Sequence, residues 1–352
     1  MEEIKLTQYS HGAGCGCKIS PKILDQILHS NFTLPDNQNL LVGNDVKDDA
    51  AVFAIDDKRA VISTTDFFMP IVDDPYNFGR IASANAISDV YAMGGDPIMA
   101  IAILGWPINV LSPLIAKKVI EGSKSICLEA GIPLAGGHSI DSPEPIFGLA
   151  VNGMVDIANL KKNCTGQKGD LLFLTKKIGV GILTTAEKKG MLAADELDLA
   201  AEQMMKLNKI GSLLGKKSFV HAMTDVTGFG VLGHLTEMAE GSKLSAEINY
   251  ESIKQISKNL DDYINRGSVP GGTIRNWDSY GHKINLPVST NKEIIKTVLA
   301  DPQTSGGLLV AVDPGALDEM RSLLIENGMI EFIEPIGKLT ELNEFAVTVN
   351  CF

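Results

Sequence analysis

The sequence predicts an α/β or α+β chain of two domains, because apolar strands and amphipathic helical segments alternate over its 352 residues. Runs rich in β-branched residues, typical of strands, occur at 60–64 and 147–151. Segments with helical spacing lie between these runs, and glycines stand where the clearest two of them end. With 45% hydrophobic and 21% charged residues, the composition is that of a soluble, folded protein.

The first half of the chain contains the clearest elements. A helix is predicted at 77–93, where a Gly-Gly pair ends it, and a second at 113–130, which ends at a glycine. Residues 97–116 carry no charge, and about 20 such residues suffice to span a membrane. Three prolines interrupt this stretch, so it predicts a buried strand at 98–104 and a loop that leads into the second helix.

A polar, lysine-rich segment at 159–170 lies between two predicted strands, and we place the domain boundary there. The expected organisation is a lead-in of residues 1–45, an N-terminal domain of residues 46–158 and a C-terminal α/β domain of residues 159–352. In the C-terminal domain, the pattern predicts a strand at 171–175 and helices at 184–189 and 200–214.

Charge and cysteine content restrict the setting in which the chain works. The 31 Lys and Arg residues against 43 Asp and Glu residues give a formal net charge of −12, with no basic cluster, so no nucleic-acid partner is expected. The five cysteines are an odd number, and the N-terminus lacks the basic start and apolar core of a signal peptide. We therefore expect reduced thiols, a cytoplasmic location and no membrane association.

Residues 12–18, called the arm below, combine three glycines with Cys15, Cys17 and Lys18. Glycines allow positive φ angles and close approach to a ligand, and the neighbouring ammonium group favours the reactive thiolate. The arm is therefore predicted to be a mobile, reactive loop. A flexible tail with incidental cysteines is the alternative. Zinc is disfavoured, because no second cysteine pair follows to complete a site.

Acidic side chains recur at the edges of apolar strands and on one predicted helix. They are Asp48, Asp49, Asp66, Asp89 and Asp225. Asn85 and Asp89 are four residues apart and share one helix face. Carboxylate and amide oxygens without histidine suit Mg²⁺ or Mn²⁺, whereas each aspartate taken alone is more often a helix cap or turn former.

If these carboxylates converge, two unit charges 4 Å apart repel by about 4 kcal/mol at an effective dielectric constant of about 20. The site would then need cations, and a nucleotide polyphosphate has the same need. Gly-rich segments at 135–139 and 304–307 are predicted to be turns whose backbone N–H groups face phosphate oxygens. Neither a P-loop motif nor a dinucleotide-binding glycine motif is present.

Seven motifs in combination make the whole chain resemble the bacterial selenophosphate synthetases, also called selenide, water dikinases. They are GCGCK at 14–18, DDAAV at 48–52, TTDFF at 64–68, NAISD at 85–89, GGHSID at 136–141, TDVTGFG at 224–230 and DPQTSGG at 301–307. The resemblance implies the ATP-binding fold of aminoimidazole ribonucleotide synthetase, in which the N-terminal sheet forms the core of a homodimer. It also implies the synthesis of selenophosphate from ATP, selenide and water, with AMP and phosphate as the other products.

The resemblance further implies a role for each site residue. Cys15 and Lys18 would be catalytic, Cys17 would be dispensable, and Lys18 would also reach the phosphates. Asp49, Asp89 and Asp225 would bind Mg²⁺. Asp66 and Asp89 would line the ATP site. Gly137, His138 and Ser139 would contact ATP from the partner subunit. A selenium-delivery protein is a further expected partner.

Two other functions remain open at the level of sequence. A kinase or synthetase of the same fold, such as thiamine-monophosphate kinase, would keep the aspartates but has no need for the thiols of the arm. A thiol-based metal or selenium carrier would use the thiols, and its aspartates would only cap helices and form turns. Consumption of ATP that depends on selenide distinguishes the enzyme from both.

Overall fold

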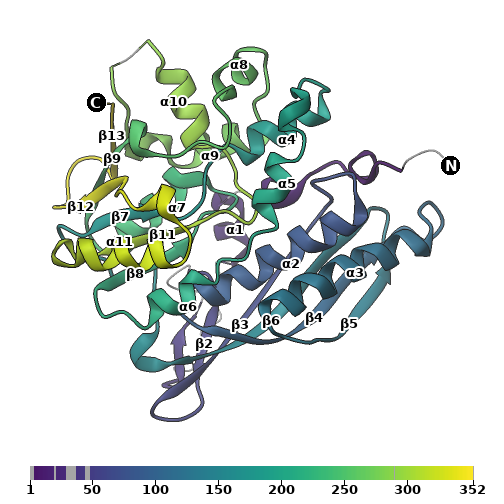
Figure 1. The fold of residues 1–352 in the computed structure, drawn as a ribbon, viewed down its shortest axis with the longest axis horizontal. Helices are drawn as coiled ribbons and strands as arrows, with labels where there is room; N and C mark the ends of the chain where they lie inside the picture. Colours follow the sequence, from purple (N-terminus) through teal and green to yellow (C-terminus); the bar gives the residue numbers. More distant parts are fainter. Residues whose placement is uncertain (1–3, 20, 29–36, 44–47, 289, 352) are drawn as a thin grey trace.

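The structure is a computed structural model that describes residues 4–19, 21–28, 37–43, 48–288 and 290–351, and these form two mixed sheets with helices packed on them (Figure 1). Strands of the first sheet are ordered β1-β2-β3-β6-β4-β5. The elements of this half are η1 (Leu6–Tyr9), η2 (Gly14–Cys17), α1 (Pro21–Leu28), β1 (Leu40–Val42), β2 (Ala51–Ala54), β3 (Arg59–Phe68), α2 (Pro75–Ala92), β4 (Asp96–Trp106), α3 (Pro113–Ala130), β5 (Leu134–Asp141) and β6 (Ile146–Asp156).

Helices α2 and α3 lie side by side on one face of the first sheet (Figure 1). Asp74 caps α2 by accepting a hydrogen bond from Asn77 N at 2.7 Å, and Gly131 ends α3 with a φ of 78°. The two helices approach closely at Gly122 of α3, where an added Cβ would lie 2.0 Å from the carbonyl oxygen of Tyr76. Because α2 also contacts β8, α5 and α6 of the second half, it is buried on nearly every side.

The opposite face of the first sheet carries exposed apolar side chains. Strand pairing places Phe67 of β3 and Ile101 of β4 on this face, where they are 49% and 40% exposed. The predicted strand at 98–104 is confirmed within β4, but the prediction that it is buried is wrong. From Met99 to Ala102 its side chains alternate between the uncovered face and the helix-covered face, so Met99 and Ile101 remain exposed. Ile98 is also exposed, at an irregularity in the pairing with β6 between Pro97 and Met99.

Strands of the second sheet are ordered β10-β13-β9-β12-β7-β11-β8. Alternate side chains of β11 enter two different cores, since Leu309 packs with helix α7 on one face and Val310 packs with α11 on the other. The elements of this half are η4 (Ile157–Asn159), β7 (Leu171–Leu174), α4 (Val180–Lys188), η5 (Ala194–Glu196), α5 (Leu199–Met204), α6 (Ile210–Gly215), β8 (Val220–Asp225), α7 (Gly230–Gly241), β9 (Ser245–Asn249), η6 (Tyr250–Ser252), α8 (Leu260–Asn265), α9 (Gly271–Tyr280), η7 (Gly281–Lys283), β10 (Ile284–Asn285), α10 (Lys292–Leu299), β11 (Leu308–Val312), η8 (Pro314–Ala316), α11 (Leu317–Glu326), η9 (Ile330–Phe332), β12 (Gly337–Thr340) and β13 (Val347–Asn350).

The helices predicted at 77–93 and 113–130 are confirmed as α2 and α3, whereas the single helix predicted at 200–214 is wrong. The chain forms α5 and α6 there, separated by a non-helical segment. Asn208 in this segment is buried and donates hydrogen bonds to Ser88 Oγ and to Gly306 O, both at 2.8 Å. These long-range contacts override the local helical pattern. Among the described residues, no helix combines the length and apolarity needed to cross a membrane.

Candidate functional site

The predicted acidic residues come together where α2 passes between the two sheets. Asp66 lies in β3, Asp89 on α2 and Asp225 at the end of β8, while Asp49 precedes β2. Thr224 Oγ1 donates a hydrogen bond to Asp49 Oδ1 at 2.8 Å and so joins the C-terminal domain to this cluster. Burial raises the pKa of both Asp49 and Asp89, and the nearby charge of Asp225 raises both further.

The arm packs into this cluster from the side of the C-terminal domain. Cys15 is 1% exposed, and its backbone N–H donates a hydrogen bond to Thr304 Oγ1 at 3.0 Å. Its thiol donates to Asn85 Oδ1 at 3.2 Å. Gly228 rests against the arm, since an added Cβ there would lie 2.8 Å from the carbonyl oxygen of Cys15. The loop predicted to be mobile is therefore closed in this structure, with the thiol turned inward.

Asn85 connects the thiol to the carboxylates. Its Oδ1 accepts a second hydrogen bond from Ser305 N at 2.7 Å, and its Nδ2 donates to Asp66 Oδ2 at 2.5 Å. The same oxygen of Asp66 accepts a hydrogen bond from Lys18 Nζ at 3.2 Å. A continuous series of contacts thus runs from Cys15 through Asn85 and Asp66 back to the arm at Lys18, and the shared helix face predicted for Asn85 and Asp89 is buried toward this site.

Burial and mutual repulsion control the charges of the cluster. Burial, the charge of Asp225 and the charge of Asp66 raise the pKa of Asp89 well above its usual value, although Thr64 donates a hydrogen bond to it. Burial raises the pKa of Asp225 to about 6, while a hydrogen bond from Ser88 and the charge of Lys18 oppose this shift. Partial burial disfavours the charge of Lys18, but the negative charges of Asp66, Cys15 and Asp89 outweigh this effect and raise the pKa of the ammonium.

Two carboxylate oxygens of the cluster are suited to a cation. Asp49 Oδ2 and Asp225 Oδ2 are buried and have no hydrogen-bond partner within the described parts of the chain. Such oxygens are costly to bury unless a cation or donor reaches them. The described residues contain no group of three or more His, Cys, Asp or Glu side chains that could hold a metal by themselves. A metal here would need further ligands, and substrate phosphates commonly supply them to Mg²⁺.

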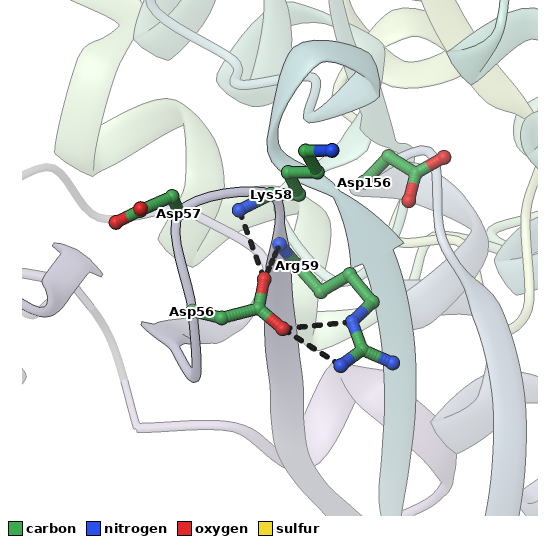
Figure 2. Close-up of a pocket in the computed structure, with 5 residues that line it drawn as sticks. All are labelled: Asp56, Asp57, Lys58, Arg59 and Asp156. Atoms are coloured by element: carbon green, nitrogen blue, oxygen red, sulfur yellow. Dashed lines mark hydrogen bonds and ion pairs between the residues drawn. The ribbon is translucent and has the colours of Figure 1, made fainter.

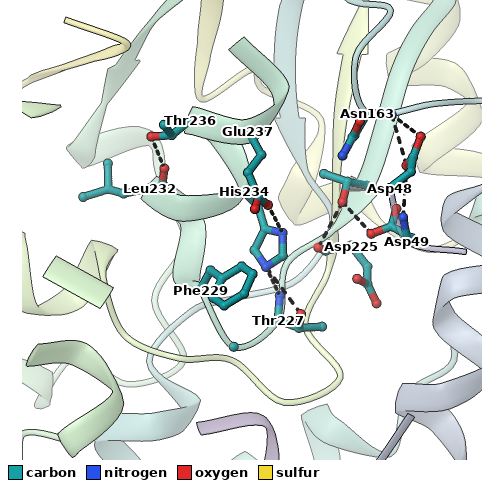
Figure 3. Close-up of polar contacts among 12 residues, drawn as sticks. Asp48, Asp49, Asn163, Asp225, Thr227, Phe229, Leu232, His234, Thr236 and Glu237 are labelled. Atoms are coloured by element: carbon teal, nitrogen blue, oxygen red, sulfur yellow. Dashed lines mark hydrogen bonds and ion pairs between the residues drawn. The ribbon is translucent and has the colours of Figure 1, made fainter. Parts of the chain in front are cut away.

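The turn after β8 is held in place by side-chain contacts of its own residues and of α7, as Figure 3 shows. His234 Nε2 accepts a hydrogen bond from Thr227 N at 3.0 Å, and burial lowers the pKa of His234 to about 3, so that the imidazole is neutral and able to accept. The ring of Phe229 stacks on the imidazole. These contacts fix the turn on which Cys15 rests.

The turn predicted at 304–307 lies within a loop at 301–307, and the polar groups of this loop are used within the protein. Gln303 Oε1 accepts hydrogen bonds from Gly179 N and Val180 N at 3.2 Å, and Asp301 Oδ2 accepts one from Gly181 N at 2.9 Å, so both side chains cap α4. The Ser305 N–H is directed at Asn85 instead of solvent. The prediction that this turn presents its amides to phosphate is therefore not supported for Ser305.

Gly137, His138 and Ser139 lie away from the aspartates of their own chain. The predicted turn at 135–139 is wrong, because these residues form part of β5, which pairs with β4 in parallel. Gly137 is in the same cross-strand row as Asp66 but three strands away, or about 14 Å at about 4.8 Å per strand. His138 pairs with Ile103 of β4. Within one chain, the structure does not bring these three residues to the acidic cluster.

Sequence reasoning missed Lys176, which follows β7 and is buried beside the site. Its Nζ donates hydrogen bonds to Lys206 O at 2.7 Å and to Ser305 O at 2.8 Å. Burial lowers the pKa of Lys176 to about 7, and the charge of Asp225 opposes this effect. No local pattern indicates that Lys176 is buried beside the site, since a lysine after an apolar strand is usually exposed.

A surface hollow at the β2–β3 turn has no part in this cluster (Figure 2). It is lined by Asp56, Asp57, Lys58, Arg59 and Asp156. Asp56 Oδ2 accepts two hydrogen bonds from the guanidinium of Arg59, at 2.7 and 2.9 Å, which close the turn. Asp66 lies seven residues further along β3, about 23 Å away at about 3.3 Å per residue.

Comparisons with known proteins agree with this architecture. The AIR synthase related protein N-terminal domain matches residues 47–155, and the corresponding C-terminal domain matches residues 167–350. The selenide, water dikinase of Pseudomonas putida is 59% identical over 99% of both chains. Those of Colwellia psychrerythraea and Pseudomonas aeruginosa are 58% and 57% identical, over 96% and 99% of both chains respectively.

Solved structures with lower identity share the fold. Thiamine-monophosphate kinase from Stenotrophomonas maltophilia superposes with a TM-score of 0.65 at 18% identity, covering 90% of this chain and 92% of its own. The hydrogenase maturation protein HypE in complex with ATP gives 0.64 at 17% identity, covering 90% and 87%. At such identity these similarities establish the fold alone.

Proposed function

This chain belongs to the selenide, water dikinase family, and we propose that it carries out the family's reaction where the arm closes over the carboxylates of β3, α2 and β8. It makes selenophosphate from ATP, selenide and water and releases AMP and phosphate. The observation that supports this location is the series of contacts from Cys15 through Asn85 and Asp66 to Lys18. It joins a soft sulfur group to a cluster of hard oxygen ligands.

The acidic cluster is proposed to bind the polyphosphate through a divalent metal, which we take to be Mg²⁺. The unpartnered oxygens of Asp49 and Asp225 fit this ion, and Asp89 would be the third ligand. When bound, Mg²⁺ would neutralise charge on the transferring phosphoryl groups. Asp66 would line the nucleotide site, and Lys18, which is 38% exposed, can exchange its contact with Asp66 for one with a phosphate oxygen.

The closed arm is proposed to serve both halves of the reaction. Cys15 would act at the selenide end of the site, because a thiol suits a soft acceptor atom better than the surrounding carboxylates do. With the arm shut, bulk water is excluded, and ADP would be retained until its β-phosphate is lost to an enclosed water. Lys18 would hold the remaining phosphates during this second step.

A pair of adjacent cysteine variants tests the assignment of Cys15. We expect Cys15→Ser to abolish selenophosphate formation, measured by phosphorus NMR, while Mg²⁺-dependent ATP binding, measured by calorimetry, stays near that of the wild type. Cys17→Ser is the matched control and should stay active. Equal loss in both variants would replace the single catalytic thiol with a C-x-C pair that acts as a unit.

We further propose that the chain is a homodimer joined through the uncovered face of the first sheet. This face carries exposed apolar side chains, and His138 and Ile140 of β5 stand on it; in the proposed dimer, residues 137–139 of one subunit would contact ATP bound to the other. In analytical ultracentrifugation, Ile101→Asp should yield a monomer with impaired ATP binding. Leu128→Asp on α3, also exposed but on the other side, should stay dimeric. A dimeric Ile101→Asp variant would contradict this interface.

The cellular setting is proposed from the same chemistry. Reduced cysteines and a selenide substrate favour the cytoplasm. Because Cys15 is buried when the arm is closed, loading of selenium requires the arm to open, and a selenium-delivery protein would act on that open state.

A further inference from the structure

We propose that Arg275 of α9 is a positioning residue that holds the arm in its closed state. Its Nη2 donates a hydrogen bond to the carbonyl oxygen of Gly16 at 2.6 Å. Gly16 stands between the two cysteines of the arm, so this contact is adjacent to Cys15 in the chain. The inference rests on the proposed function only in taking the arm as the part that carries the reactive thiol.

Helix α9 holds Arg275 in a fixed position, because neighbouring residues of this helix contact both the 225–230 turn and the segment leading into the 301–307 loop. Asn276 Nδ2 donates hydrogen bonds to Gly228 O at 2.8 Å and to Ala300 O at 3.0 Å. Gly272 packs against Pro302, where an added Cβ would lie 2.9 Å from Cγ. The arm, the 225–230 turn and the 301–307 loop therefore meet on one short stretch of α9.

Arg275 differs in kind from the other groups that hold the arm. Thr304 and Asn85 bind Cys15 from within the buried site that the substrates would enter. The guanidinium is exposed and reaches the arm from outside, so its contact with Gly16 can persist while the site fills. A hydrogen bond from a charged donor is about twice as strong as a neutral one. Arg275 can therefore hold the arm closed from the protein surface, and we call this role a latch.

A latch and a purely electrostatic role predict opposite effects on the thiol. A cation beside a cysteine favours the reactive thiolate, so removal of its charge alone would slow alkylation of Cys15. Removal of a latch would speed alkylation, because the arm would open more often and expose a thiol that is otherwise buried. The rate of alkylation in the resting enzyme therefore separates the two roles without any turnover.

The experiment uses the full chain with Cys17→Ser, so that one thiol remains in the arm. N-ethylmaleimide labelling of Cys15 is followed by mass spectrometry in the absence of substrates. We expect Arg275→Ala to raise the labelling rate about tenfold, as loss of one charge-assisted hydrogen bond implies. Arg275→Lys should give an intermediate rate, because it keeps the charge but not the planar donor. Arg266→Ala removes an exposed arginine that follows α8 and pairs with Asp262 of that helix, and it should leave the rate unchanged.

Cys127 provides an internal standard, since it is 1% exposed in α3 and its labelling requires an opening of the fold outside the arm. An unchanged or slower rate at Cys15 in Arg275→Ala would overturn the latch. Equal acceleration at Cys15 and Cys127 would also overturn it, because the variant would then have loosened the whole fold. If Cys15→Ser proved active, the proposed catalytic role would fail while the labelling result would still decide whether Arg275 closes the arm.

Discussion

Replacing Asp225 with asparagine should stabilise the protein in the absence of divalent cations. Asp225 is 2% exposed, and burial raises its pKa from 3.8 to about 6. At about 1.36 kcal/mol per pKa unit, keeping this carboxylate ionised in the folded state costs about 3 kcal/mol. The asparagine side chain is the same size but carries no charge, so we expect Asp225→Asn to gain up to about 3 kcal/mol in free energy of unfolding at pH 8.

The sign of the pH dependence provides the sharper test. A carboxyl group whose pKa is higher in the folded state binds its proton more tightly there, so wild-type stability falls as the pH rises from about 4 to about 6. The advantage of Asp225→Asn should therefore be complete above pH 7 and absent at pH 4.

Urea unfolding at pH 4 and pH 8, with EDTA present, measures this difference. Asp57→Asn removes an exposed carboxylate of the β2–β3 turn and should have little effect at either pH. A gain for Asp225→Asn that is equal at pH 4 and pH 8 would refute the electrostatic explanation, and so would a loss of stability at pH 8.

Two other predictions concern Asp49 as a proposed metal ligand and the close contact between helices α2 and α3. Asp49→Asn keeps the side-chain size but removes a charged ligand. Calorimetry should therefore show weaker Mg²⁺-dependent binding of a non-hydrolysable ATP analogue. If the affinity were unchanged, Asp49 would be a turn residue only. Gly122→Ala should lower the free energy of unfolding by about 1–3 kcal/mol, because its Cβ would meet the Tyr76 carbonyl oxygen at 2.0 Å. Lys124→Ala, on the exposed side of α3, is the control and should leave the free energy of unfolding unchanged. Equal stability of the two variants in urea would contradict this packing.

Local sequence signals were sufficient for some of the elements that build the site. The ends of α3 are marked by Ser112, Pro113 and Gly131, each of which has a conformational reason to stand there. The four-residue spacing of Asn85 and Asp89 correctly predicts that one face of α2 serves the site. These inferences depend only on neighbours in the chain.

Other features depend on contacts that no local pattern encodes. The hydrogen bond between Ser305 N and Asn85 Oδ1 joins residues 220 positions apart. The sequence around Asn208 favours a helix, but Asn208 donates hydrogen bonds to Ser88 and Gly306, and these contacts interrupt the helix between α5 and α6. Lys176 and Arg275 are ordinary lysine and arginine residues in sequence, and only the fold places one beneath Ser305 and the other against the arm.

We propose that one closed site, with Cys15 at one end and the acidic cluster at the other, couples selenide phosphorylation to the loss of two phosphoryl groups from ATP. Phosphorus NMR of the wild-type enzyme during anaerobic turnover with selenide tests it most directly. We expect AMP, orthophosphate and selenophosphate to rise together in equal amounts. Accumulation of ADP as the main nucleotide product would contradict it and would indicate a simple kinase.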